Sequence, residues 1–149
     1  MSICIGREPE GVNAVKEDGD WEEVVMTVDS GATDTVMPPT LLPSVRITEG
    51  AAFRRGVEYE MANGEMAPNL GEKRFKGMTE EGSEREVVAQ VVEVSQSLLS
   101  VSRCVAAGNK VVFDSEGSYI ENKATGEVSW MQEEGRLWTV KMWVRKQGF

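Results

Sequence analysis

The chain has 149 residues and a formal net charge of −9, so it is long enough for one domain with a sizeable hydrophobic core. The acidic balance disfavours nucleic-acid binding, because phosphate contacts need clustered Lys and Arg, and the one basic cluster is Lys141, Arg145 and Lys146 near the end of the chain. No apolar run is long enough to cross a bilayer and the first residues do not form a signal peptide, so we expect no membrane partner and no secretion.

The sequence contains no histidine, and this narrows the possible chemistry. Ser-His-Asp and Cys-His catalysis are excluded, together with the commonest zinc ligand, and we predict neither a metal site nor a cofactor. Carboxylate chemistry remains available for hydrolysis. The two cysteines, Cys4 and Cys104, are far apart in a chain without a signal peptide, so we predict free thiols.

The first part of the chain predicts a β-hairpin. Residues 1–11 contain Gly6 and Pro9, which predict a loose arm or one short strand. Residues 12–15 predict a strand, and the turn sequence around Asp18-Gly19 is the strongest short-range hairpin signal in the chain. Residues 21–28 would then form the returning strand.

A carboxylate follows this returning strand, in the sequence Asp29-Ser30-Gly31-Ala32-Thr33-Asp34. A strand that ends on Asp, a small hydroxyl residue and Gly presents the carboxylate on a tight loop, where neighbouring N–H and O–H groups can hold it. We therefore predict that Asp29 is the only catalytic side chain. The alternative is a plain surface turn, since Asp-Ser-Gly is also a good turn sequence, but the apolar residues on both sides argue against it.

The middle of the chain predicts an irregular connection and a second hairpin. Three prolines within residues 38–43 prevent regular structure. Residues 53–61 and 65–76 look extended around Ala62-Asn63-Gly64, which predicts a long hairpin with its tip near Asn63-Gly64, or simply an ordinary surface hairpin. Residues 77–82 predict a loop, and the valine-rich residues 86–94 predict a central strand.

The last third predicts one short helix followed by more strands. Apolar residues at 98, 101, 104 and 105 follow helical spacing, and Gly108 falls where a helix end favours a left-handed residue. We expect this helix to be the only one. A strand at 111–113 follows, then two hairpins, and the final strand at 137–144 has apolar residues on both faces, which is typical of a buried strand or one that meets a partner.

Two stretches of the chain resemble one known family. The run from Asp29 to Met37 is similar, residue by residue, to the active-site motif of retropepsins, the aspartic proteases of retroviruses and retrotransposons. Leu98-Leu99-Ser100, followed by the predicted helix and the strand at 111–113, resembles the closing segment of the same family. The retroviral pattern has glycine where this chain has Ser100, so the chain looks more like the copia-type retrotransposon proteases. The resemblance covers about residues 12–113 and is weak over 114–149.

The resemblance implies a mainly β fold, a retropepsin-like closed β-barrel (the acid protease fold) with one short helix and extra β-hairpins at the C-terminus. Residues 1–149 would form a single protease domain, with a core of about 12–113 and a C-terminal β extension at 114–149 whose place in the barrel the sequence leaves open. Retropepsins are obligate dimers with one Asp-[Ser/Thr]-Gly loop per subunit, so the implied partner is a second copy of this chain. The implied substrate is a peptide or polyprotein, met in the cytoplasm or within a virus-like particle.

The resemblance also implies roles for individual residues. Asp29 would be catalytic, in an active-site loop formed by Ser30, Gly31, Ala32 and Thr33. Substrate would be bound by Asp34 and by the hairpin tip, which closes over the peptide: Ala62, Asn63 and Gly64. The site would be supported by Leu98, Leu99 and Ser100.

The residue at position 32 gives an expectation about pH. A hydroxyl there would donate to the outer oxygen of Asp29 and favour its anion, whereas alanine cannot. We therefore predict an activity optimum that is mildly acidic to near neutral.

Two other classes of function stay open. One is a catalytically inactive, retropepsin-like dimeric β module that serves peptide binding or assembly, which the departure at Ser100 also allows. The other is an acidic capsid-associated or adaptor domain, for which the sequence has no specific motif.

Overall fold

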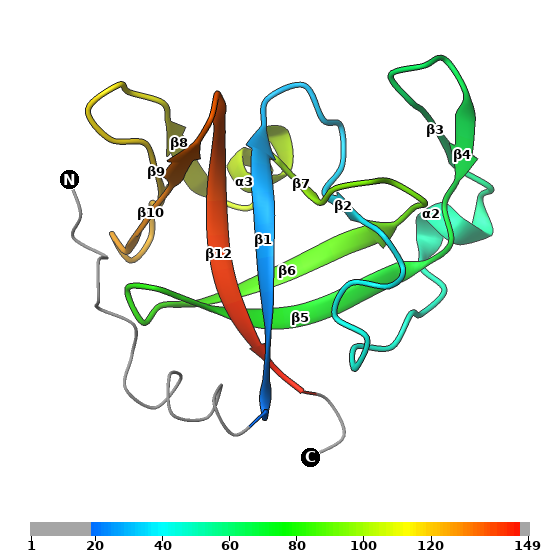
Figure 1. Cartoon of the computed structure of the whole chain (residues 1–149), viewed down its shortest axis with the longest axis horizontal. Helices are drawn as coiled ribbons and strands as arrows, with labels where there is room; N and C mark the ends of the chain where they lie inside the picture. Colours follow the sequence, from blue (N-terminus) through cyan, green and yellow to red (C-terminus); the bar gives the residue numbers. More distant parts are fainter. Residues whose placement is uncertain (1–18, 147–149) are drawn as a thin grey trace.

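The computed structural model describes residues 19–146, and they are mainly β, as predicted (Figure 1). Two short helices accompany the strands: α2 (Ala51–Arg54) and α3 (Val101–Ala106). The predicted strand at 12–15 and Cys4 lie outside the described residues. The strands are β1 (Trp21–Asp29), β2 (Val36–Met37), β3 (Glu58–Glu60), β4 (Met66–Pro68), β5 (Glu72–Thr79), β6 (Glu84–Val91), β7 (Leu98–Ser100), β8 (Asn109–Val112), β9 (Tyr119–Asn122), β10 (Val128–Trp130), β11 (Gln132–Glu134) and β12 (Leu137–Arg145).

Six strands are paired in a ring, in the order β1-β7-β2-β6-β5-β12 and back to β1. We call these six strands the strand ring. β11 pairs with β12 and extends the six strands to a seven-stranded sheet. β8, β9 and β10 form a separate three-stranded sheet, and β3 and β4 form a two-stranded sheet. In Figure 1, β1 and β12 run side by side across β5 and β6.

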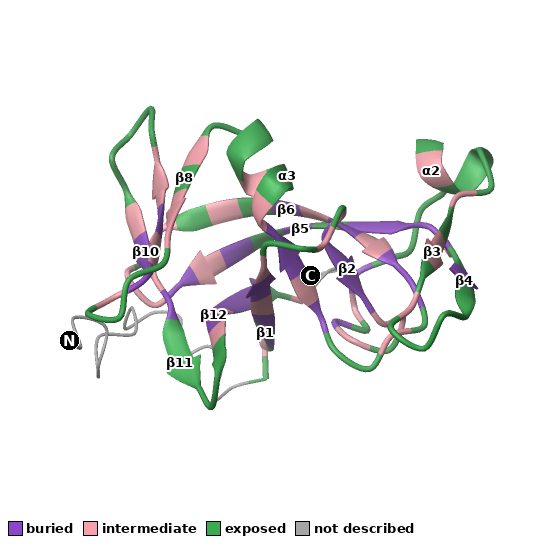
Figure 2. Cartoon of the chain, turned by 90° about the horizontal axis from the view of Figure 1, so that it is seen from above, coloured by how far each residue is buried: buried purple, intermediate pink, exposed green. Residues whose placement is uncertain are grey.

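The main hydrophobic core is formed by alternating side chains of the strand ring. In β1, Val24, Met26 and Val28 are buried, whereas Glu23 and Val25 point outward, as the two-residue period of a strand requires. Figure 2 shows the central strands buried and the β11 edge exposed. Other members of this core come from the remaining strands of the ring, from β9 and from the residue between β10 and β11: Phe75, Val87, Ala89, Leu99, Ile120, Met131, Val140, Met142 and Val144.

The C-terminal segment belongs to this core. β12 pairs with β1 through seven residue pairs, from Trp21↔Arg145 to Thr27↔Thr139, and on its other edge with β5. The apolar residues on both faces of β12 predicted a buried strand or a contact with a partner. The position of β12 between β1 and β5 explains these residues. Within residues 19–146, the antiparallel neighbour of β1 is therefore a segment more than a hundred positions away in the sequence.

The prediction of a single helix was wrong, because residues 51–54 form α2. Phe53 and Arg54 were expected to be extended, but one helical turn is closed here by the bond from the Arg54 N–H to the Gly50 carbonyl (3.1 Å). A four-residue helix is too short to produce the 3.6-residue apolar period. No helix within residues 19–146 is long and apolar enough to cross a membrane.

The predicted helix after residue 97 is present but shorter, since Leu98–Ser100 is strand β7 and α3 begins at Val101. Ser100 is the N-cap, and its hydroxyl accepts a hydrogen bond from the Arg103 N–H (3.2 Å). Gly108 follows the helix at φ +95°, in the left-handed region that the sequence predicted. The loop predicted at 77–82 is also shorter, because β5 continues to Thr79 in its pairing with β6 and β12.

The proline-rich connection is irregular, as predicted, and a buried lysine holds it. The Lys73 ammonium, 1% exposed, donates to the carbonyls of Pro39 (3.1 Å), Leu41 (2.7 Å) and Leu42 (3.0 Å). These carbonyls have no regular ladder to join, so the ammonium satisfies groups that would be costly to bury unpaired. Burial lowers the pKa of Lys73 below its usual value.

Candidate active site

Asp29 is the last residue of β1, and its carboxylate is held by the turn that follows. The Gly31 N–H donates to Asp29 Oδ1 over 2.7 Å. Val28 before it is buried and Ser30 after it is exposed, so the strand carries the carboxylate from the core to the surface. The second carboxylate oxygen has no hydrogen-bond partner within residues 19–146.

The two stretches singled out from the sequence lie side by side. β7 runs parallel to the end of β1, and Asp29 is paired with Ser100. Ser100 is completely buried, its hydroxyl donates to the Ala32 carbonyl (2.8 Å), and its N–H donates to the Thr35 hydroxyl (3.1 Å). The loop that follows Asp29 is thus clamped to β7 by polar contacts from a residue 68 positions further along the chain.

The predicted hairpin is formed by β3 and β4, with Ala62-Asn63-Gly64 exposed at its tip. Gly64 has φ +87°, which explains the Asn-Gly turn, and the Met61 N–H donates to the Glu65 carbonyl (2.8 Å). The paired strands span residues 58–68, which is less than predicted, because α2 precedes them and residues 69–71 separate β4 from β5. In Figure 1 the hairpin stands apart from the strand ring.

A cavity of about 650 Å³ lies between the Asp29 loop and the hairpin. Its walls are largely apolar, with Val36 and Leu98 from the strand ring and Met61 from the hairpin. Of the predicted tip residues, Ala62 lines the cavity. The full lining is Asp29, Gly31, Ala32, Thr33, Asp34, Val36, Tyr59, Glu60, Met61, Ala62, Val94, Ser95, Gln96 and Leu98.

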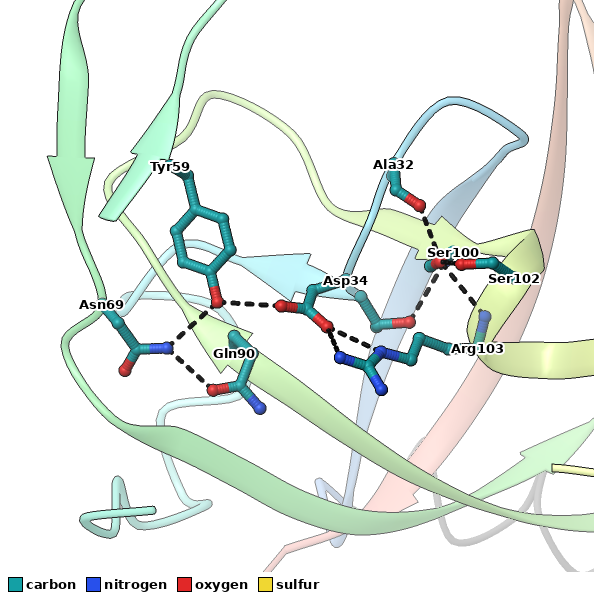
Figure 3. A network of polar contacts seen from close by, with 9 residues as sticks. Ala32, Asp34, Tyr59, Asn69, Gln90, Ser100, Ser102 and Arg103 are labelled. Atoms are coloured by element: carbon teal, nitrogen blue, oxygen red, sulfur yellow. Dashed lines mark hydrogen bonds and ion pairs between the residues drawn. The ribbon is translucent and has the colours of Figure 1, made fainter. Parts of the chain in front are cut away.

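Asp34 lines the same cavity, but its carboxylate is already engaged by two side chains (Figure 3). Oδ1 accepts from Arg103 Nε (2.6 Å) in an ion pair with the guanidinium, and Oδ2 accepts from the Tyr59 hydroxyl (3.1 Å). The Tyr59 oxygen in turn accepts from Asn69 Nδ2 (3.2 Å), which also donates to Gln90 Oε1 (2.8 Å). Burial raises the pKa of the Tyr59 phenol above its usual 10.0, and the Asp34 charge acts in the same direction.

Sequence reasoning missed Tyr59, Asn69, Gln90 and Arg103. Each comes from a different segment, and no spacing in the chain links them. The resemblance named Asp34 as a substrate-binding residue. Its acidic side chain was the one signal in the sequence for a nearby basic or hydroxyl partner such as Arg103 or Tyr59.

No protein-family model, curated protein or solved structure matches this chain. The site is therefore interpreted from its own residues.

No group of three or more His, Cys, Asp or Glu side chains within residues 19–146 could hold a metal ion. Cys104 is a free, partly buried thiol, and burial raises its pKa, which keeps it protonated and a poor nucleophile.

The arrangement suits proton transfer by a carboxylate. Asp29 has one oxygen fixed by a backbone N–H and the other free, beside a cavity large enough for several residues of a peptide. A fixed carboxylate of this kind can accept a proton from water, but water attack on an amide also needs an acid to polarise the carbonyl. The other carboxylate that lines the cavity, that of Asp34, is occupied by its contacts with Arg103 and Tyr59.

Proposed function

We propose that the protein is a homodimeric aspartic endopeptidase of the retropepsin type, which hydrolyses peptide bonds in polyprotein processing. The observation that supports it best is the alignment of β7 with the end of β1, with Ser100 clamping the Asp29 loop. Two short motifs that resemble the same family thus meet at one carboxylate. The strand ring supports the closed barrel that such an enzyme requires.

The missing acid is provided by a second copy of the chain. Two Asp29 carboxylates on a two-fold axis cannot both ionise easily, so the pair shares one proton. The ionised Asp29 takes a proton from a water molecule while the protonated Asp29 donates to the scissile carbonyl oxygen. The water oxygen bonds to the carbonyl carbon and gives a diol, without a covalent enzyme intermediate. The C–N bond then breaks as the Asp29 that took the water proton passes it to the amide nitrogen, while a diol hydroxyl returns its proton to the other Asp29, so the pair again shares one proton.

The peptide lies in the cavity between Asp29 and the β3–β4 hairpin. An extended peptide can hydrogen-bond to hairpin backbone as an added strand, and the apolar walls then receive its side chains. The exposed tip at 62–64 closes over it and excludes water from the reacting bond.

Cleavage of a mixed peptide library by the purified protein tests this function. We expect cleavage at internal peptide bonds that a statine-type inhibitor suppresses, because its hydroxyl mimics the attacked carbonyl between the two carboxylates. Mass spectrometry of the products identifies the cut bonds. Absence of cleavage at any pH between 4 and 8, at concentrations where the protein is dimeric, would contradict the proposal and favour a binding module.

Ala32→Ser is expected to shift the acidic limb of the pH–rate profile to lower pH. The new hydroxyl lies in the loop beside Asp29 and can donate to its carboxylate, which favours the anion. The measurement is kcat/KM against pH for both proteins. Thr33→Ser is the control, since it alters the neighbouring residue while keeping a hydroxyl, and its profile should match that of the wild type. An unmoved acidic limb in Ala32→Ser would count against this role of position 32.

A further inference from the structure

The β3–β4 hairpin has a single polar attachment to the rest of the described chain. Its strands form a separate two-stranded sheet and share no backbone ladder with the strand ring. Within residues 19–146, every hydrogen bond from residues 58–68 to another segment involves the Tyr59 hydroxyl. The tip adds only internal bonds, such as the Glu65 N–H to Asn63 Oδ1 (2.9 Å).

That attachment ends on the loop that carries Asp29. Asp34 Oδ2 accepts from Tyr59, and Asp34 Oδ1 is fixed by Arg103 of α3, so the carboxylate is held from both sides (Figure 3). The N-cap of α3 is Ser100, which binds the same loop at the Ala32 carbonyl. The hairpin, the loop and α3 therefore converge on the Asp34 carboxylate.

We propose that Tyr59 is a positioning residue, whose hydrogen bond to Asp34 holds the β3–β4 hairpin in a fixed position relative to Asp29. We call this hydrogen bond the lock. Tyr59 and Met61 also pack against a buried apolar cluster of Val36, Ala67 and Val92, but such apolar contacts are non-directional. A hydrogen bond to a charged, doubly held acceptor is directional and strong. Only the catalytic consequence of the lock rests on the proposed peptidase function.

The donor of the lock keeps its proton. Burial raises the pKa of Tyr59, so the phenol retains the proton that it donates to Asp34. On the acceptor side, the Arg103 guanidinium forms an ion pair with Asp34 Oδ1 and fixes the carboxylate in place.

Amide hydrogen exchange of Tyr59→Phe, measured by mass spectrometry without substrate, tests the lock. Tyr59→Phe removes the hydrogen bond to the charged Asp34 and the bond from Asn69, which predicts roughly tenfold to a hundredfold faster exchange in peptides covering residues 58–68. Tyr119→Phe is the matched control. Tyr119 is the only other tyrosine, its ring packs on Trp130 at 5.1 Å between centroids, and its hydroxyl has no hydrogen-bond partner in the described residues. Unchanged exchange in Tyr59→Phe would overturn the proposal.

A double-mutant cycle identifies the hydrogen-bond partner of the Tyr59 hydroxyl. Asp34→Ala removes the acceptor while leaving Tyr59 in place. If the lock is correct, adding Tyr59→Phe to Asp34→Ala increases exchange at 58–68 much less than Tyr59→Phe does in the wild type, because only the bond from Asn69 to Tyr59 is left to lose. Additive increases would show that the Tyr59 hydroxyl acts through another group and would overturn the proposal.

Kinetics then separate the lock from the proposed function. In a wild-type protein that cleaves peptides, Tyr59→Phe should raise KM about fivefold and change kcat less, because the hairpin binds ground state and transition state alike. An unchanged KM would contradict the positioning role. A wild-type protein that cleaves nothing would refute the peptidase, while the exchange experiment would still decide whether the lock exists.

Discussion

Asp29→Asn is expected to lower kcat/KM by about 10³-fold or more, because the amide cannot take a proton from water, and to leave the proposed dimer intact. The substitution is nearly isosteric, and its Oδ1 can still accept from the Gly31 N–H, so the loop should keep its shape. Peptide cleavage gives the rate, and analytical ultracentrifugation gives the oligomeric state. Retained cleavage at the wild-type rate would exclude Asp29 as the catalytic group.

Asp114→Asn provides a closely matched control. Asp114 Oδ1 accepts from the N–H of Glu116 two residues on (3.0 Å), the same local contact that Asp29 makes with Gly31, but Asp114 does not line the cavity. Its activity should equal that of the wild type. A similar loss in both variants would point to a general effect of removing surface charge.

Mixed dimers test whether the site needs two chains. When wild type and Asp29→Asn are mixed in equal amounts and allowed to exchange subunits, random pairing puts only half of the wild-type chains in wild-type dimers, so activity should fall to about half. Undiminished activity after complete exchange would show that a single chain holds a complete site.

Met142→Ala is expected to lower the free energy of unfolding by about 2–5 kcal/mol, because it opens a cavity in the core. Met142 is 2% exposed and lies in β12 between Val24 of β1 and Thr79 of β5. Its sulfur also fills the space beside Gly77, where an added Cβ would approach to 2.6 Å. Chemical denaturation at one fixed protein concentration measures the change, since the proposed dimer would make stability depend on concentration.

Leu137→Ala is the control on the same strand. Leu137 is 46% exposed, so its truncation should cost well under about 1 kcal/mol. Equal effects of the two substitutions would mean that β12 does not form part of the core.

Several features of the fold could be predicted because they depend on neighbouring residues. The strand before Asp29, the Asn63-Gly64 tip and the positive φ of Gly108 all follow from local patterns and backbone preferences. Strand ends were less accurate, and α2 was missed, because a single helical turn has no periodic signal.

In the candidate site, too, the features set by neighbouring residues could be predicted, whereas the contacts between distant segments could not. The sequence by itself determined that Asp29 ends a buried strand on a tight Asp-Ser-Gly turn, since strand preference and turn chemistry are properties of a few adjacent residues. Only the tertiary structure decided that β12 is the neighbour of β1 and that Tyr59 and Arg103 hold Asp34. Strand partners and side-chain contacts between distant segments depend on how the whole core packs, because many strands of similar pattern could pair equally well by local criteria.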